Sequence, residues 1–212
     1  MFGKDWDILL GINAKTLPIS VRDICNYLKI RTASFRNAEK IIEDNDLSGY
    51  MKNDAFSYKD GSGFILLYNE SLPEDELRIA ILHEVAHIVS GHCDTENDSF
   101  DGKCTTYNKV SSCDSDEVED AAYTFAVKLL APAAVLWALK IRSHKEIEKL
   151  CLIPRKFARL RADRMEELYK REKHMLAREG KTCFLRSRHE MAVYENFRPF
   201  IEKLKSEQNI SK

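Results

Sequence analysis

Apolar and polar residues follow a helical spacing near the start of the chain. Ser20 precedes Asp23 at the spacing of an N-terminal helix cap, and apolar residues then recur through Leu28. This pattern predicts a short helix that ends near Lys29. A second short helix is expected over residues 34–43, after which polar residues and a glycine interrupt the pattern.

Residues 50–70 have the pattern of strands instead. Residues 50–58 alternate weakly between apolar and polar, and the glycine-containing segment 60–63 predicts a turn. Residues 64–68, Phe-Ile-Leu-Leu-Tyr, form a short apolar run that is typical of a strand. Such a strand could present an edge to an extended peptide, which is a common mode of peptide recognition.

Two strong helices are predicted next. The first begins at a capping box over residues 71–74 and stops at Gly91. Its apolar residues include Leu77, Ile81, Leu82, Val85, Ile88 and Val89. Residues 92–114 are polar and predict a loop, and the second helix follows this loop and runs to about Pro132.

The remainder, residues 133–212, predicts helices only. Breaks are expected near Ser143, residues 152–154, Gly180 and Pro199. The elements together predict an α+β fold in which a small sheet packs on the first strong helix. We expect one domain over residues 1–135 and a mostly helical C-terminal region over residues 136–212.

Composition and charge limit the classes of protein and of binding partner that we expect, and the cellular compartment. With 44% hydrophobic and 32% charged residues, the chain is ordinary for a soluble globular protein. Its formal net charge of −1 gives no whole-chain bias toward nucleic acid or membrane. The six cysteines form no Cys-x-x-Cys pair, and the N-terminus lacks the apolar run of a signal peptide. We therefore expect a cytoplasmic protein with reduced thiols and no membrane contact.

The first strong helix contains the motif His83-Glu84-Val85-Ala86-His87. Histidines four residues apart lie on one face of a helix, where two neutral imidazoles can bind one Zn²⁺. The Glu84 carboxylate can reach a zinc-activated water without itself binding the metal. The spacing predicts a site in which Glu84 takes a proton from water attacking a peptide carbonyl and returns it to the leaving amine.

A catalytic zinc site needs a third protein ligand, and two patterns offer one. In the first, the ligand lies six residues after the second histidine, a position that Cys93 occupies and that fits poorly here. In the second, an acid comes from the start of the next helix, where Glu117, Glu119 and Asp120 lie. Glu119 lies at the edge of the apolar face, so spacing favours it, but Glu117 and Asp120 stay open.

Two stretches together resemble the ImmA/IrrE family of metallopeptidases. The first consists of residues 64–69 and 78–92 and contains the histidine motif. The second is residues 119–132, EDAAYTFAVKLLAP, which is similar to the family pattern Glu-x-x-Ala-Asn-x-Phe-Ala-x-x-Leu-Leu-Met-Pro. The resemblance covers roughly residues 15–135 and is far more specific than the histidine motif alone.

The resemblance implies a zincin-like metallo-endopeptidase domain with zinc ligands at His83, His87 and Glu119 and a catalytic base at Glu84. Family members commonly cut a helix-turn-helix repressor of mobile-element or stress-response genes, so such a repressor is the implied protein substrate. Tyr123 replaces the usual asparagine of the family. Its hydroxyl could support a metal ligand or its ring could pack, and we favour packing.

The C-terminal region offers an alternative class of function. Residues 143–164 have the rhythm of two helices joined by a short turn, a unit that can contact DNA. Its cations that could meet phosphates are Arg155, Lys156, Arg159, Arg161 and Arg164. The alternative is therefore a DNA- or protein-binding regulator whose zinc site is structural or vestigial, with DNA contact the less favoured interpretation.

Overall fold

The computed structural model describes residues 4–91, 115–179, 185 and 187–210. The chain divides into two compact units. The sheet unit is Ser20–Ala126, and the helical unit joins Met1–Ile19 to Val127–Lys212. The expected domain boundary near residue 135 stays a prediction.

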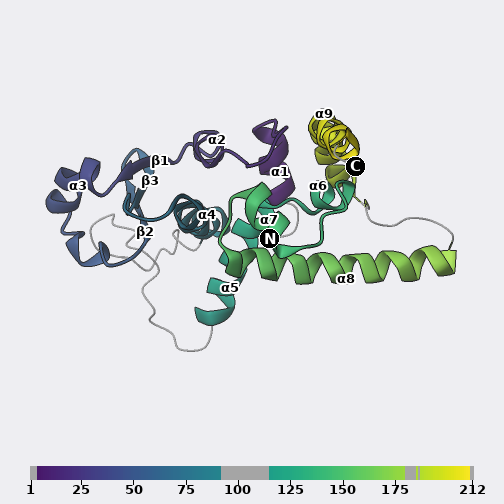
Figure 1. The fold of residues 1–212 in the computed structure, drawn as a ribbon. Helices are drawn as coiled ribbons and strands as arrows, with labels where there is room; N and C mark the ends of the chain where they lie inside the picture. The colour runs from purple at the N-terminus through teal and green to yellow at the C-terminus, as the bar shows by residue number, and fades with distance from the viewer. Residues whose placement is uncertain (1–3, 92–114, 180–184, 186, 211–212) are drawn as a thin grey trace. The chain divides into compact units, whose positions relative to one another are not determined.

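The sheet unit is mixed α and β, which confirms the α+β class (Figure 1). Its elements are α2 (Val21–Tyr27), β1 (Arg31–Ser34), η1 (Arg36–Ala38), α3 (Glu39–Asp44), η2 (Ser48–Tyr50), β2 (Ala55–Asp60), β3 (Gly63–Tyr68), α4 (Glu74–Ser90) and the first part of α5 (Ser115–Leu130). The predicted cap of α2 is present, because the Ser20 hydroxyl accepts a hydrogen bond of 3.2 Å from the Asp23 backbone N–H. The expected helix over residues 34–43 is shorter than predicted. Ser34 ends the strand β1, residues 36–38 form the 3₁₀ helix η1, and the helix α3 begins only at Glu39.

The three strands described in this unit have the order β1-β3-β2. β1 pairs with β3 in parallel, and β2 pairs with β3 antiparallel. The expectation that residues 64–68 present a sheet edge is therefore wrong, because β3 is the central strand. Its continuous apolar run explains this position, since Leu66 and Leu67 are fully buried and a strand covered on both faces favours such a run.

The sheet has two covered faces. On one face Phe56, Tyr58, Ile65 and Leu67 form a hydrophobic cluster with Phe35 and with residues of η1 and α3. The opposite face, which by strand alternation carries Ser57 and its partner Leu66, lies against α4, which packs on both β2 and β3. The predicted packing of a small sheet on the motif helix is thus observed.

The prediction for the start of α4 is wrong, and the prediction for its end is confirmed. No side chain caps its N-terminus, where Pro73 occupies the cap position, so the predicted capping box is wrong. Three acidic residues in the first turn favour this end electrostatically instead, and Asn69 accepts a hydrogen bond from the Ser71 backbone N–H at 3.0 Å. Gly91 ends the helix in the left-handed region, with φ 75°, as predicted.

The helical unit contains α1 (Lys4–Gly11), α6 (Ala133–Ala138), α7 (His144–Cys151), α8 (Arg155–Glu179) and α9 (Arg188–Ile210). α7 packs on α8, and α9 packs on α1 and α6.

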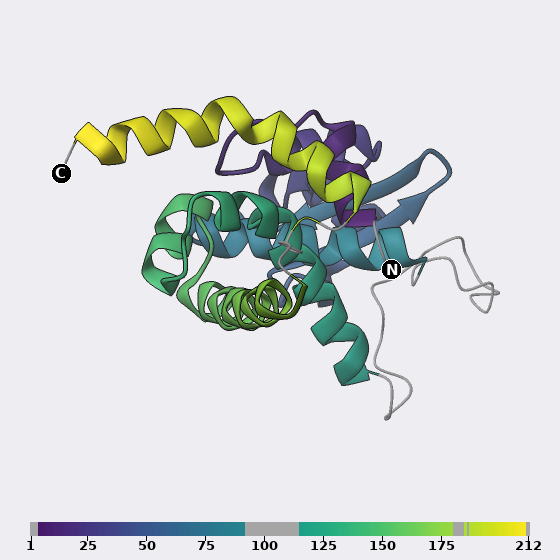
Figure 2. The ribbon, with the colours of Figure 1, turned by 90° about the vertical axis from the view of Figure 1, so that its right-hand side faces the viewer.

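The predicted break at Pro199 is wrong, since α9 continues through it (Figure 2). Buried Val193, Phe197 and Ile201 anchor the helix on both sides of the proline, and this packing offsets its lost backbone hydrogen bond.

The predicted unit of two helices and a short turn is present in α7 and α8. Ser143 caps α7, accepting a hydrogen bond of 3.3 Å from the Lys145 backbone N–H, and Leu152 ends it in the left-handed region. Among the residues described, no helix combines the length and the apolar character that crossing a membrane requires.

Candidate metal centre

The helix α4 presents His83 and His87 on one face, one turn apart. Their ring centroids are 4.7 Å apart, and the two Nε2 atoms lie 3.0 Å from each other. Both side chains are buried, with 9% and 4% of the residue surface exposed. The four-residue spacing therefore brings two imidazole nitrogens to one point, as the sequence predicts.

Glu119 joins this point from α5. Its Oε2 atom lies 3.0 Å from His83 Nε2, and its Oε1 atom lies 3.4 Å from His87 Nε2. Of the three acids that spacing left open, Glu119 alone is grouped with the histidines among the described residues, while Glu117 and Asp120 are exposed. The other candidate, Cys93, lies outside the described residues.

The donor set fits a metal ion. Ligands at about 2.0–2.1 Å from a tetrahedral Zn²⁺ lie roughly 3.3 Å from one another. The three observed separations of 3.0, 3.0 and 3.4 Å are close to this value. Two imidazoles and one carboxylate are also the ligand types found in catalytic zinc sites that keep a fourth position open.

Burial favours the neutral form of the first histidine. Desolvation lowers the pKa of His83 from 6.5 to about 4. The imidazole is therefore neutral near pH 7, so its contact with Glu119 is not an ion pair at that pH. Neutral imidazole is also the form that binds metals, because a protonated ring has no free lone pair.

Glu84 lies next to the first histidine on α4 and contacts the sheet. The Ser57 hydroxyl on β2 donates a hydrogen bond of 3.1 Å to Glu84 Oε2. Ser57 is 2% exposed, and a buried hydroxyl is normally hydrogen-bonded. Sequence reasoning missed this serine, because the weak alternation over residues 50–58 does not show which side chains face the motif helix.

Tyr123 packs against the first histidine. Its ring centroid is 4.2 Å from that of His83, at an interplanar angle of 41°. Burial raises the pKa of Tyr123, and the nearby Glu119, Asp54 and Glu84 raise it further, so the hydroxyl keeps its proton. Among the described residues His83 Nδ1 has no hydrogen-bond partner, so ring packing, not a hydrogen bond at that atom, restricts the imidazole.

One of the five cations of α8 named above is not on the surface. Arg155, Lys156 and Arg159 are exposed, and Arg164 forms an ion pair of 2.6 Å with Glu167. Arg161 is buried, and its Nε donates a hydrogen bond of 2.7 Å to the Ala131 carbonyl oxygen. The expectation that Arg161 could contact phosphates is therefore wrong, because its position coincides with the buried stripe of α8.

Two histidines of α4 lie together with Glu119 of α5, Glu84 is next to the first histidine, and α4 packs against a small sheet; this is an arrangement suited to a metallopeptidase-type domain. Residues 30–163 match the family model of the IrrE N-terminal-like domain, a peptidase family. This match spans more than half of the chain, and the chain belongs to that family. No curated protein and no solved structure gives a significant match.

Proposed function

We propose that the protein is a zinc-dependent endopeptidase that makes a limited cleavage in a regulatory protein. The observation that carries this proposal is the convergence of His83 Nε2, His87 Nε2 and a Glu119 carboxylate oxygen within 4.8 Å, with Glu84 on the same helix as the histidines. His83, His87 and Glu119 would hold the ion. A zinc ion bound there would supply a Lewis acid and lower the pKa of water.

The remaining steps belong to the side chains. Glu84 would accept a proton from the attacking water and return it to the leaving amine, because it lies beside the ligands without being one of them. The Ser57 hydroxyl would orient the Glu84 carboxylate through the 3.1 Å hydrogen bond. The Tyr123 ring would hold the His83 imidazole in its binding orientation. A zincin-like arrangement is supported by the packing of α4 on β2 and β3.

The substrate is proposed from the family. Since members of the ImmA/IrrE family commonly cut helix-turn-helix repressors, we propose a repressor of this kind, from mobile-element or stress-response genes, as the protein partner. Peptide recognition at a sheet edge would fall to β1 or β2 and not to β3, which is paired on both sides.

The proposal is tested by incubating the zinc-loaded protein with a helix-turn-helix repressor encoded beside its gene and identifying the products by mass spectrometry. The wild-type protein should produce one or a few discrete cuts, and Glu84→Gln should abolish them while zinc content is retained. Glu76→Gln, an exposed glutamate on the same helix, is the matched control and should cut normally. Binding of the repressor without cleavage by zinc-loaded wild-type protein would contradict an endopeptidase and favour a regulator with a structural zinc site.

A further inference from the structure

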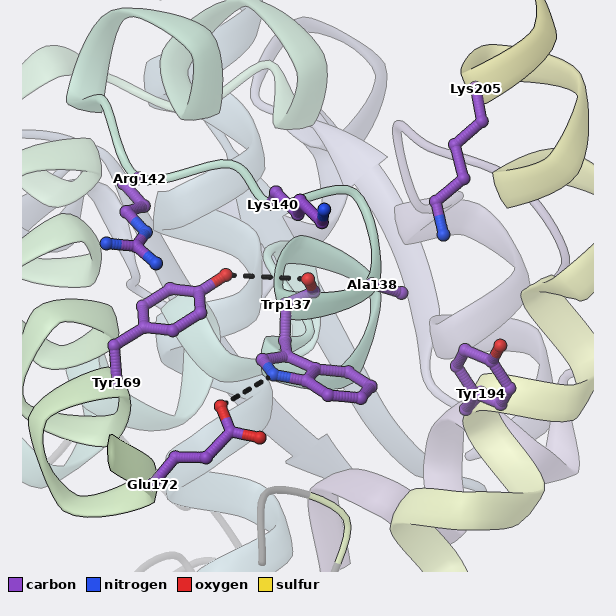
Figure 3. A pocket seen from close by; sticks show the side chains of 8 residues that line it. All are labelled: Trp137, Ala138, Lys140, Arg142, Tyr169, Glu172, Tyr194 and Lys205. Carbon is purple, nitrogen blue, oxygen red and sulfur yellow. Dashed lines mark hydrogen bonds between the residues drawn. The ribbon is translucent and has the colours of Figure 1, made fainter. Parts of the chain in front are cut away.

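The helical unit contains a pocket far in sequence from the histidine motif. It has a volume of about 430 Å³ and is lined by residues of α6, α8 and α9 and of the segment after α6 (Figure 3). This size lies within the range of pockets that bind small molecules. The lining combines three aromatic rings with three cations and one carboxylate.

The ring of Trp137 is held in place at the centre of this pocket. Its indole N–H donates a hydrogen bond of 2.9 Å to Glu172 Oε2, and the backbone carbonyl oxygen of Trp137 accepts one of 3.4 Å from the Tyr169 hydroxyl (Figure 3). Both contacts come from α8. A half-buried tryptophan whose indole nitrogen is hydrogen-bonded offers a preorganised flat surface, and Tyr194 of α9 adds a second ring to the lining.

Three cationic side chains line the pocket together with these rings. Arg142 lies over the Tyr169 ring at 4.0 Å from its centroid, so its guanidinium is positioned by an aromatic partner. Lys140 and Lys205 are exposed, and neither has an acidic partner among the described residues. In Figure 3 the Lys205 ammonium and the Tyr194 hydroxyl both face the space beside Ala138.

Lys140 lies just after the C-terminal end of α6. Its backbone is left-handed, with φ 58°, and is held there by hydrogen bonds of its N–H to the Trp137 carbonyl and of the Ile141 N–H to the Leu136 carbonyl, both 2.9 Å. Glycine or asparagine is favoured in this conformation, so a lysine there has an energetic cost. The left-handed turn ends α6 in the usual way and leaves the exposed Lys140 side chain in the lining of the pocket.

We propose that this pocket binds a small planar anion of the nucleotide class, with its ring on Trp137 and Tyr194 and its phosphate near Lys140 and Lys205. Aromatic faces stack on nucleobases with little dependence on base identity. Ammonium and guanidinium groups make charge-assisted hydrogen bonds to phosphate oxygens. The single carboxylate, Glu172, accepts the hydrogen bond of the Trp137 indole N–H. This site is separate from the proposed peptidase chemistry and does not depend on it.

The fluorescence of Trp137 provides a direct test. The chain has two tryptophans, Trp6 and Trp137, so Trp6→Phe leaves Trp137 as the single emitter. Titration with adenosine 5′-monophosphate should quench it saturably with a Kd below about 1 mM. Adenosine alone and inorganic phosphate alone should each bind at least ~10-fold more weakly. Adenosine lacks the phosphate that the lysines would bind, and inorganic phosphate lacks the ring that would stack on the aromatic residues. Calorimetry on the wild-type chain measures the same affinities without a tryptophan substitution.

Variants of the lysines distinguish a specific binding site from a weak association with the protein surface. Lys140→Gln and Lys205→Gln should each weaken binding of adenosine 5′-monophosphate by about 5-fold or more. Lys203→Gln, which changes an exposed lysine on the same helix that does not line the pocket, should leave it unchanged. The proposal is overturned if no saturable binding occurs up to about 5 mM. It is also overturned if phosphate alone binds equally well, or if the lysine variants bind like the wild-type chain.

Discussion

The Ser57 hydroxyl on β2 and the Glu84 carboxylate on α4 are joined by a hydrogen bond of 3.1 Å. The bond links the residue proposed as the proton carrier to the strand on which α4 packs. A carboxylate that moves a proton must hold one orientation toward the reacting water, and a buried hydroxyl donor restricts its rotation. The packing of helix on sheet thus has a chemical consequence at Glu84.

Replacing Ser57 should slow cleavage without removing the metal. In Ser57→Ala we expect kcat to fall about 10-fold while zinc content and KM stay close to the wild-type values, because only the orientation of Glu84 changes. Steady-state kinetics on a cleaved repressor measure both parameters. Ser48→Ala, at an exposed serine of η2, is the control and should be neutral. An unchanged kcat in Ser57→Ala would show that the hydrogen bond has no role in turnover.

Tyr123 should act through its ring and not through its hydroxyl. The ring lies 4.2 Å from the His83 ring, so Tyr123→Phe should keep zinc affinity within about 3-fold. Tyr123→Ala removes the packing partner and should weaken affinity about 10- to 100-fold. Competition with a chromogenic zinc chelator measures the difference. If the phenylalanine variant loses as much affinity as the alanine variant, the hydroxyl and not the packing supports the ligand.

Arg161 should contribute to stability and not to nucleic-acid binding. Arg161→Met leaves the Ala131 carbonyl oxygen without its donor and should lower the free energy of unfolding by about 1–3 kcal/mol in urea titrations. Arg159→Met changes an exposed cation two residues earlier and should stay within about 0.5 kcal/mol of wild type. Equal stability of the two variants would refute the structural role of Arg161.

Cys25 should make the protein less stable in alkali. Burial raises the pKa of its thiol from 9.0 to about 11. The thiol of the unfolded chain ionises first as pH rises, so the stabilising contribution is complete below pH 9 and is lost between pH 9 and pH 11. Between pH 9 and pH 11, the free energy of unfolding of the wild type should therefore fall by about 2–3 kcal/mol relative to that of Cys25→Ala. A difference that stays constant from pH 8 to pH 11 would contradict the raised pKa.

The sequence predicts those features that depend on local spacing. The pairing of His83 with His87 follows from the helical repeat, and the stop at Gly91 follows from the left-handed conformation that glycine adopts at helix ends. The preference for Glu119 came from its place beside the apolar face of α5. The structure groups Glu119 with the two histidines, because helix periodicity decides which of three neighbouring acids can turn inward, and its role as a metal ligand stays a prediction.

Features that depend on pairing between distant segments could not be predicted. Strand order is not encoded locally, so the sequence did not reveal that β3 is central or that Ser57 faces Glu84. Charge alone suggested that Arg161 is exposed. Its position on the stripe of buried Ala158 and Met165 was the signal that could have placed it inside.

Zinc content tests the proposed metal centre most directly. Wild-type protein purified without added zinc should contain about one zinc ion per chain by atomic spectrometry. Glu119→Gln should lose most of this zinc, while Glu117→Gln, at an exposed glutamate two residues earlier on α5, should retain it. Wild-type protein with less than about 0.2 zinc per chain and no recovery on adding zinc would contradict the proposed centre, as would equal zinc in the two variants.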